Sequence, residues 1–288
     1  MIFVQSFVTS CRRHPWITTV CAAGYFILVV LPHLQVGLFF QWLFSHFTRS
    51  QYQLSVLSVF VLLFLIVCLV LLRGMIVSRR VAPVLVFLGI TFVLTAVSFK
   101  LLVIHNIELI HLPQYTLLAV LIFPLARRFG DTVFWTTLLG AVDEAYQYFI
   151  LAPERTMQYD FNDIILNLLG AAFGVILLFA CGVSPEPCKK RALYANPVLL
   201  TLLGLAAGIV IMFQTGLLTL YPPQDGQPVL GVIVKELPKG FWSHISHLNA
   251  HYHIVLPLEG LILTGLLLAL YYSLDTTSFY LQRKNHAK

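Results

Sequence analysis

The stretch "AVDEAYQYFILAPERTMQYDFNDIILNLLG", residues 141–170, decides how this chain folds. It joins the end of one apolar run to the start of the next, and it carries acidic residues at both of these ends. The chain has 288 residues, of which 59% are hydrophobic and only 10% are charged. Soluble domains average about 25% charged residues, so this composition indicates an integral membrane protein. We therefore expect the stretch to form a hairpin between two membrane helices.

Eight apolar runs are long enough to be candidate membrane helices, which need about 20 residues each. The predicted fold is therefore an all-α polytopic helical bundle with about eight transmembrane helices. The run 111–126 is the weakest because it is short and begins with His111 and Pro113, and in a seven-span alternative it would be a re-entrant or interfacial segment. The eight runs are 15–32, 54–73, 81–103, 111–126, 131–150, 161–181, 196–220 and 254–274.

The basic residues predict the orientation. In an eight-span arrangement, 13 of the 18 lysines and arginines fall on one side, which the positive-inside rule makes the cytoplasmic side. Both termini are then cytoplasmic, and the first span is retained. The net charge of +6 reflects this bias and the attraction to anionic headgroups, and not a nucleic-acid partner. The 13 are Arg12, Arg13, Arg73, Arg79, Arg80, Arg127, Arg128, Lys189, Lys190, Arg191, Arg283, Lys284 and Lys288.

Residues 1–288 are expected to form a single membrane domain, because the loops on the inner side are short. Two outer loops are longer. The aromatic loop 33–53 is typical of an interfacial segment or belt anchor. The loop 221–253 contains "PVLGVIVKEL", which has strand-like composition, and we expect it to form a small extracytoplasmic cap.

Polar side chains gather near the outer end of the fourth, fifth and sixth runs. At about 1.5 Å rise per residue, all of them lie within roughly 10 Å of the outer boundary. Within each run the spacing of three, four or seven residues puts them on one helix face. They are Glu108, His111 and Tyr115 in the fourth run, Asp143, Glu144 and Gln147 in the fifth, Arg155 in the connecting loop, and Asp160, Asp163 and Asn167 in the sixth.

Two interpretations compete for this cluster. Charged groups inside a membrane are costly and usually face a bundle interior or a water-filled cavity. The first interpretation is a structural network, with Arg155 clamping Asp143 or Asp163 and with Asn167 tying two helices together. The second is a functional pocket, which we favour because structural networks rarely need five acids, a histidine, a tyrosine and an arginine at one depth.

The residue types in this pocket suit general acid–base chemistry. A buried carboxylic acid stays protonated, whereas one that faces an arginine stays ionised, and such a pair supplies both an acid and a base. The candidate catalytic residues are Glu108, His111, Asp143, Glu144 and Asp163. The candidate substrate-binding residues are Tyr115, Gln147, Arg155, Asp160, Asn167 and Glu259, with Arg155 as a clamp for a phosphate or carboxylate.

The spacing of these residues resembles the VanZ-like family of bacterial integral membrane proteins. The resemblance rests on Glu108-x-x-His111-x-x-x-Tyr115, Asp143-Glu144-x-x-Gln147, Arg155, and Asp160-x-x-Asp163-x-x-x-Asn167-x-x-Gly170, and it covers residues 50–180. It implies a multi-pass protein of the bacterial cytoplasmic membrane, linked to glycopeptide resistance and lipoglycopeptide tolerance. The family brings no settled reaction, and its first block usually begins with a basic residue where this chain has Glu108.

These patterns predict a protein that binds or modifies an amphiphilic cell-envelope component: a lipid-linked sugar, a phospholipid, or a glycopeptide or lipopeptide. Whether it is an enzyme stays open. The alternatives are a transporter or flippase that uses the same acids as proton or ligand sites, and a non-catalytic scaffold. The sequence shows no inverted repeat and no paired broken helices, which favours a one-sided site over alternating access. The expected partners are membrane lipids and the amphiphile, with no nucleic acid.

A second cluster, "HISHLNAHYHIVLPLEG", follows the outer loop at residues 244–260. His244, His247 and His251 have the spacing to line one face of a helix, an arrangement that can bind zinc. The spacing matches no standard zinc signature, so a role in the lid or at the interface is favoured, and no cofactor is predicted. Glu259, just inside the eighth run, enters at the same outer level as the pocket.

Overall fold

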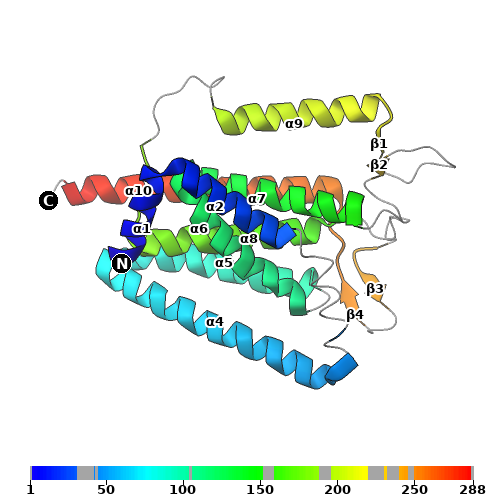
Figure 1. The fold of residues 1–288 in the computed structure, drawn as a ribbon, viewed down its shortest axis with the longest axis horizontal. Helices are drawn as coiled ribbons and strands as arrows, with labels where there is room; N and C mark the ends of the chain where they lie inside the picture. The colour runs from blue at the N-terminus through cyan, green and yellow to red at the C-terminus, as the bar shows by residue number, and fades with distance from the viewer. Residues whose placement is uncertain are drawn as a thin grey trace.

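The computed structural model describes residues 2–30, 42, 45–103, 106–151, 159–187, 196–219, 230–231, 240–245 and 250–286. Helices dominate these residues, and the long ones lie roughly side by side (Figure 1). The α-helices are α1 Ile2–Arg13, α2 Pro15–Val30, α4 Arg49–Ser78, α5 Val81–Leu101, α6 His111–Ala126, α7 Phe129–Tyr146, α8 Phe161–Ala180, α9 Pro197–Gln214 and α10 Pro257–His286. A 3-10 turn, η1 (Asn106–Ile110), precedes α6, and a π-helix, η2 (Gln147–Leu151), follows α7.

Six helices in the described part of the chain are long and apolar enough to cross a membrane. They are α4, α5, the segment Glu108–Ala126 that ends in α6, α8, α9 and α10. The prediction of an all-α membrane bundle is therefore confirmed, whereas the count of eight is not. The other two predicted spans do form helices. The apolar part of α2 covers 14 of the residues that the structure describes, Pro15–Leu28, and α7 contains Asp131, Asp143 and Glu144.

Helix α8 lies at the centre of the bundle, and 16 of its 20 residues are buried. Two glycines allow it to approach α6 closely. A Cβ at Gly170 would lie 2.7 Å from the carbonyl oxygen of Leu112, and a Cβ at Gly174 would lie 2.6 Å from that of Thr116. The Thr116 hydroxyl also donates to the Gly170 carbonyl at 2.8 Å. Small residues four apart are a common way for membrane helices to pack backbone against backbone.

Helix α7 packs on another face of α8, and a third glycine sets this contact. A Cβ at Gly140 would lie 2.8 Å from Nδ2 of Asn167. Nearer the other end, Phe129 stacks on Phe123 of α6 and meets Phe179 of α8 edge-on, with ring centroids 5.1 and 5.8 Å apart. The side chains of α6, α7 and α8 therefore form one continuous core that holds these three helices in fixed register.

The amphipathic helix α1 was not predicted from the sequence. Its buried Val8, with Val4 and Phe7 beside it, packs onto the core formed by α6 and α8. These residues recur every three or four positions, which is the helical signal that could have revealed it. Helix α1 ends at Arg12 and Arg13, and the His14 backbone leads directly into α2.

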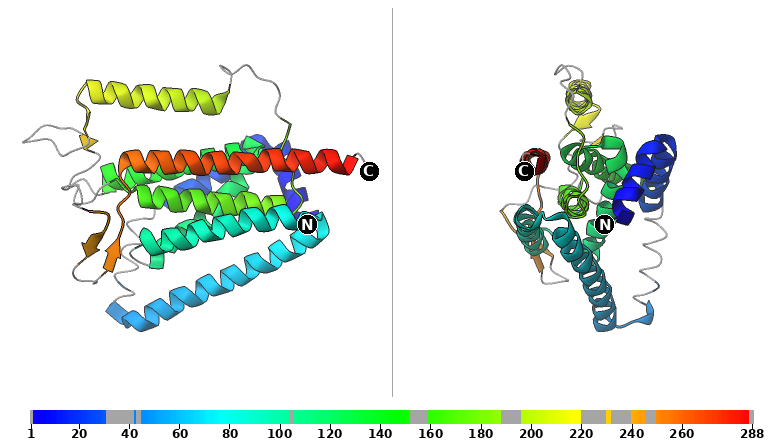
Figure 2. Two further views of the ribbon diagram at one scale, coloured as in Figure 1. Left: turned by 180° about the vertical axis from the view of Figure 1, so that it is seen from behind. Right: turned by 90° about the vertical axis from the view of Figure 1, so that its left-hand side faces the viewer.

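Helices α4 and α9 lie at the edges of the molecule. Helix α4 meets α5 near its Ser78 end and diverges from it toward Arg49, as two views show (Figures 1 and 2). Helix α9 stands apart from the bundle, and Val198 is the only buried residue among its 18 (Figure 2). Both helices thus expose apolar side chains on most sides, as expected for helices surrounded by lipid.

The arginines gather around the C-terminal end of α8. Arg80 donates to the carbonyl oxygens of Phe179 and Val183 at 3.2 and 2.7 Å, so it joins the last turn of α8 to the residues that follow the helix. Glu186 lies 3.2 Å from Arg127 and 3.9 Å from Arg12. These groups lie at the opposite end of α8 from Asp163, so the bundle has a basic end and an acidic end.

Asp275 of α10 caps helix α7 at the basic end. Its carboxylate oxygens accept from the backbone N–H groups of Phe129 and Gly130 at 2.8 and 3.1 Å, and Arg128 lies 3.6 Å away. The residue before α7 contributes no side-chain cap, so an acid from another helix supplies the acceptor. Both chain ends lie at this end of the bundle (Figure 1). The cytoplasmic location of that end remains a prediction.

Short strands lie at the acidic end of the bundle. Strand β1 (Leu218–Thr219) pairs in parallel with β2 (Leu230–Gly231), which falls within the segment of predicted strand-like composition. Strand β3 (Ser243–Ile245) pairs antiparallel with β4 (Ala250–Tyr252). Residues 221–229, 232–239 and 246–249 of the predicted cap, and 33–41 and 43–44 of the aromatic loop, lie outside the described residues.

Candidate functional site

Tyr115 of α6 and Asp143 of α7 form the most deeply buried pair of the acidic end. The Tyr115 hydroxyl donates to Oδ2 of Asp143 at 2.8 Å, and neither residue is exposed to solvent. Because a buried carboxyl group needs hydrogen-bond partners, the tyrosine lowers the cost of placing Asp143 between helices. This pair therefore fixes the depth at which α6 and α7 meet.

Gln147 links Asp143 to its neighbour Glu144. Its Nε2 lies 3.4 Å from Oδ1 of Asp143 and 3.1 Å from Oε1 of Glu144, as the predicted shared face of Asp143 and Gln147 requires. Gln147 is the first residue of the π-helix η2, where α7 changes its winding. Single π-helical turns often occur at functional sites because they redirect side chains. Here the turn directs the amide toward both carboxyl groups.

His111 lies between two side chains of α8. Its Nδ1 is 2.8 Å from Oδ1 of Asn167, and its Nε2 is 3.5 Å from Oδ2 of Asp163. Since the amide oxygen is an acceptor, Nδ1 carries a proton, and Nε2 is the atom that can exchange a proton with Asp163. The side chains of His111 and Asp163 are 11% and 17% exposed, so this pair lies nearer the surface than Asp143.

Asn167 is fully buried and is held from both sides. Its oxygen accepts from His111, while its Nδ2 lies beside Gly140 and has no hydrogen-bond partner among the residues that the structure describes. A buried amide donor without an acceptor costs about 1–3 kcal/mol. The Nδ2 atom of Asn167 lies where α8 contacts both α6 and α7, close to His111.

Asp160 forms the N-cap of α8. Its Oδ1 accepts from the backbone N–H groups of Asn162 and Asp163 at 2.9 and 3.3 Å. Burial raises the pKa of Asp160, and the two backbone hydrogen bonds partly offset that rise. The sequence predicted Asp160 as a substrate-binding residue, and the structure shows that it caps α8.

Two tyrosines outside the helices show how the acids are grouped. Burial raises the pKa of Tyr159 above its ordinary value, and the negative charges of Glu144 and Asp143 raise it further. Burial likewise raises the pKa of Tyr252, with smaller contributions from Asp160 and Glu108. Both tyrosines therefore lie close to the acids at this end of the bundle.

Glu108 comes just before the α-helix, although the sequence placed it on one helix with His111 and Tyr115. It lies on the 3-10 turn η1, because the α-helix begins only at His111. Side chains three residues apart eclipse each other in a 3-10 turn, so this winding alone does not separate Glu108 from His111. The half-buried Glu108 belongs to the acidic end through its proximity to Tyr252.

Glu259 lies in a separate ion pair at the start of α10. Its Oε1 is 2.9 Å from Nε2 of His253, and its Oε2 accepts from the Leu256 backbone at 3.3 Å. The ring of His253 stacks on Phe241 at 4.1 Å. These contacts tie Glu259, in the first turn of α10, to His253 of the cap.

The histidines at 244 and 251 do not line a helix. They face each other across the strands β3 and β4, with ring centroids 4.6 Å apart. Their seven-residue spacing is compatible with a short hairpin as well as with a helix, and in the structure they lie on paired strands. His247 and Arg155 lie outside the described residues. No group of three or more metal-ligating side chains occurs in the part of the chain that the structure describes.

Asn162 joins neighbouring segments at this end of the bundle, and its role was not predicted from the sequence. Its Nδ2 donates to the carbonyl oxygens of Leu102 and His253 at 3.2 and 2.8 Å, and its Oδ1 accepts from Val255 at 3.0 Å. One buried amide thus ties α8 to the end of α5 and to the cap. Its position beside Asp163 in the first turn of α8 was the only available signal.

Comparisons with known proteins identify no relative. No protein-family model matches the chain, and neither a curated protein nor a solved structure matches it significantly.

Proposed function

We propose that this protein binds an amphiphilic cell-envelope component at the acidic end of α6–α8 and carries out acid–base chemistry on its head group. The observation that carries the proposal is the His111 imidazole, positioned by Asn167 on one side with Asp163 on the other. A histidine whose tautomer is fixed and whose second nitrogen faces a carboxyl group is suited to move a proton. The partial exposure of both side chains gives a head group access to them.

The proposed substrate class is a lipid-linked sugar, a phospholipid, or a glycopeptide or lipopeptide. Carboxylate and amide oxygens near the entrance are good acceptors for the hydroxyl and amine donors of such head groups. The apolar helices around the site would hold the lipid tail within the bilayer. We further propose that the acidic end faces outward in a bacterial cytoplasmic membrane, since the arginines gather at the other end.

The resemblance to the VanZ-like family remains part of this proposal. The motif residues that carry it include the pairs Tyr115–Asp143 and His111–Asn167, and both pairs are in direct contact. A contribution to glycopeptide resistance follows from the resemblance alone. It predicts that a strain expressing the protein tolerates more glycopeptide than a strain expressing the Asp163→Asn variant.

Turnover of a labelled lipid-linked sugar in proteoliposomes tests the proposed reaction. His111→Ala and Asp163→Asn should lower turnover at least about 100-fold, which is typical of losing a general acid–base group. Asp131→Asn is the matched control, because Asp131 lies on α7 at the basic end, where Tyr272 donates to it at 2.9 Å. Full turnover in both site variants would refute the acid–base role. Binding without turnover in the wild type would identify a binding protein.

A flux measurement distinguishes the proposed acid–base site from a transporter that uses the same acids. Proteoliposomes loaded with a pH-sensitive dye should show no proton entry when the substrate is added, because the proposed site opens to one end only. Substrate-driven proton flux that Asp143→Asn abolishes would replace this proposal with proton-coupled transport.

A further inference from the structure

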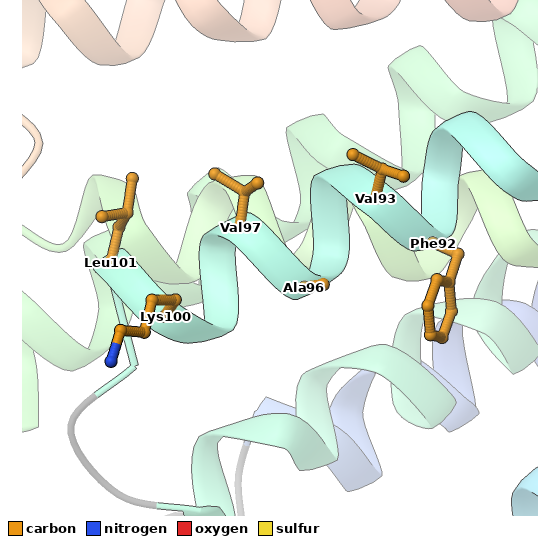
Figure 3. Close-up of a pocket in the computed structure, with 6 residues that line it drawn as sticks. All are labelled: Phe92, Val93, Ala96, Val97, Lys100 and Leu101. Atoms are coloured by element: carbon orange, nitrogen blue, oxygen red, sulfur yellow. The ribbon is translucent and has the colours of Figure 1, made fainter.

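We propose that the outer half of α5 holds an anionic phospholipid, with an acyl chain in an apolar groove and the headgroup phosphate on Lys100. This inference is independent of the proposed reaction, since none of the groove residues belongs to the acidic end of α6–α8. The groove has a volume of about 390 Å³ and is lined by Phe92, Val93, Ala96, Val97, Lys100 and Leu101 (Figure 3).

The shape of the groove follows from the order of side chains along α5. Ala96 is the smallest lining residue and lies midway along it, between the larger Phe92 and Lys100 (Figure 3). Val93, Val97 and Leu101 form one edge (Figure 3). This volume lies in the range of ligand pockets, which are about 300–1,000 Å³.

Helix α4 leaves this part of α5 uncovered. The two helices are joined at Arg79 and Arg80 and separate toward the far end of α5, where Lys100 lies (Figures 1 and 2). In a bilayer, the apolar space beside α5 must be filled by something apolar. A lipid chain running along the helix fits this space, because the groove follows the helix axis.

Lys100 selects the kind of lipid. It is exposed in the last turn of α5, and it forms no ion pair with any residue that the structure describes. A lysine at a membrane interface attracts anionic lipid, and it extends its charge to headgroup level while its stem stays apolar. A zwitterionic lipid offers the same phosphate but no net charge, so the lysine favours an anionic headgroup.

The headgroup end of the groove is fixed in place by the cap. The carbonyl oxygen of Leu101 accepts from the His253 backbone at 2.6 Å, and that of Leu102 accepts from Asn162 at 3.2 Å. The helix end that carries Lys100 is therefore held on both sides. A preformed site loses less conformational freedom on binding, which favours a retained lipid over a rapidly exchanging one.

Native mass spectrometry of the detergent-purified full chain tests the proposal, with phosphatidylglycerol and phosphatidylcholine of identical acyl chains as probes. The wild type should bind the first lipid about fivefold more tightly, the effect of one lysine near the surface. Lys100→Glu should remove this preference, and Lys100→Arg should keep it. Equal binding of both lipids by the wild type, or a preference unchanged in Lys100→Glu, would overturn the proposal.

Filling the groove tests the acyl-chain part separately. Ala96→Phe should lower the binding of both lipids, because the ring would occupy the groove. Ala82→Phe is the control, since it makes the same change at an exposed alanine near the other end of α5. Equal binding by the two phenylalanine variants would show that the chain lies elsewhere. A lysine in the last turn also stabilises the helix dipole, which is why lipid preference is measured and not stability.

Discussion

The imidazole of His111 and the amide of Asn167 meet at 2.8 Å across the contact between α6 and α8, and this one hydrogen bond fixes both the site and the helix packing. Asn167→Ala should therefore destabilise the protein by about 1–3 kcal/mol, because Nδ1 of the buried histidine loses its acceptor. Thermal unfolding in detergent measures this loss. Unchanged stability would mean that His111 finds another acceptor.

A loss of stability in Asn167→Ala does not show whether Asn167 positions the His111 ring or only packs against it. If Asn167 positions the ring, this variant should also change the pH profile of turnover. A histidine that is free to choose its tautomer no longer presents Nε2 to Asp163 in a fixed way. Thr137→Val serves as a control, because its buried hydroxyl bonds only within its own helix, at 2.8 Å to the carbonyl of Val133. That variant should keep the profile of the wild type.

Gly170→Ala and Gly174→Ala should each destabilise the bundle by about 1–3 kcal/mol. A methyl group at either position would press on the backbone of α6, which cannot move aside without separating the two helices. Gly204→Ala and Gly208→Ala provide matched controls on α9, where nothing lies within 4 Å of the added carbon. Melting temperatures of the four variants check the prediction, and a similar loss in both pairs would contradict it.

Asn162→Ala should loosen the cap while leaving the central helices intact. Three hydrogen bonds from one buried amide hold the segment around His253 and Val255. Hydrogen exchange should accelerate over residues 250–256 and stay unchanged in α8 beyond its first turn. His253→Ala, which removes only the ring contacts of the cap, should produce a smaller effect. Uniform acceleration across the whole bundle would instead indicate global destabilisation.

Two substitutions at Asp160 separate its charge from its capping role. Because burial raises its pKa in the folded state, the folded protein holds this proton more tightly than the unfolded chain does. Stability from this group is therefore greatest below the unfolded pKa of about 4 and falls as the pH rises toward the folded pKa. Asp160→Asn keeps a good N-cap and removes this fall.

At neutral pH we therefore expect Asp160→Asn to be at least as stable as the wild type. Asp160→Ala should lose about 1 kcal/mol at every pH, because the N–H groups of Asn162 and Asp163 lose their acceptor. Thermal unfolding between pH 4 and 7.5 checks both expectations. If Asp160→Asn is as destabilised as Asp160→Ala, the carboxylate has an additional partner that the amide cannot replace.

Much of the fold could be predicted because membrane helices leave a strong signal. Apolar runs predicted where eight of the helices lie, although α4 and α10 extend well beyond the runs 54–73 and 254–274. Helical spacing placed Asp163 and Asn167 on one face, and in the structure both lie beside His111. The 3-10 turn that carries Glu108 could not be predicted, because a change from 3-10 to α winding leaves no mark in the pattern. The spacing of His244 and His251 could not decide between a helix and a strand pair, since it fits both kinds of structure.

Other features could not be predicted because they depend on packing between distant segments. Asn162 and Asp275 look like ordinary polar residues near helix ends, yet each satisfies backbone groups of another element. Only the three-dimensional arrangement assigns them a partner. The same holds for Gly140, whose importance comes from Asn167 on the neighbouring helix.

The separation of an acidic and a basic end along α8 has an electrical consequence. His111 and Asp163 lie at the first turns of α6 and α8, so a proton that reaches them from that end crosses little of the membrane. A full crossing is worth about 2.3 kcal/mol per 100 mV, and a short entry path takes only a small part of this. Occupancy of the site by protons should then follow the acidity of the adjoining solution and respond little to membrane voltage.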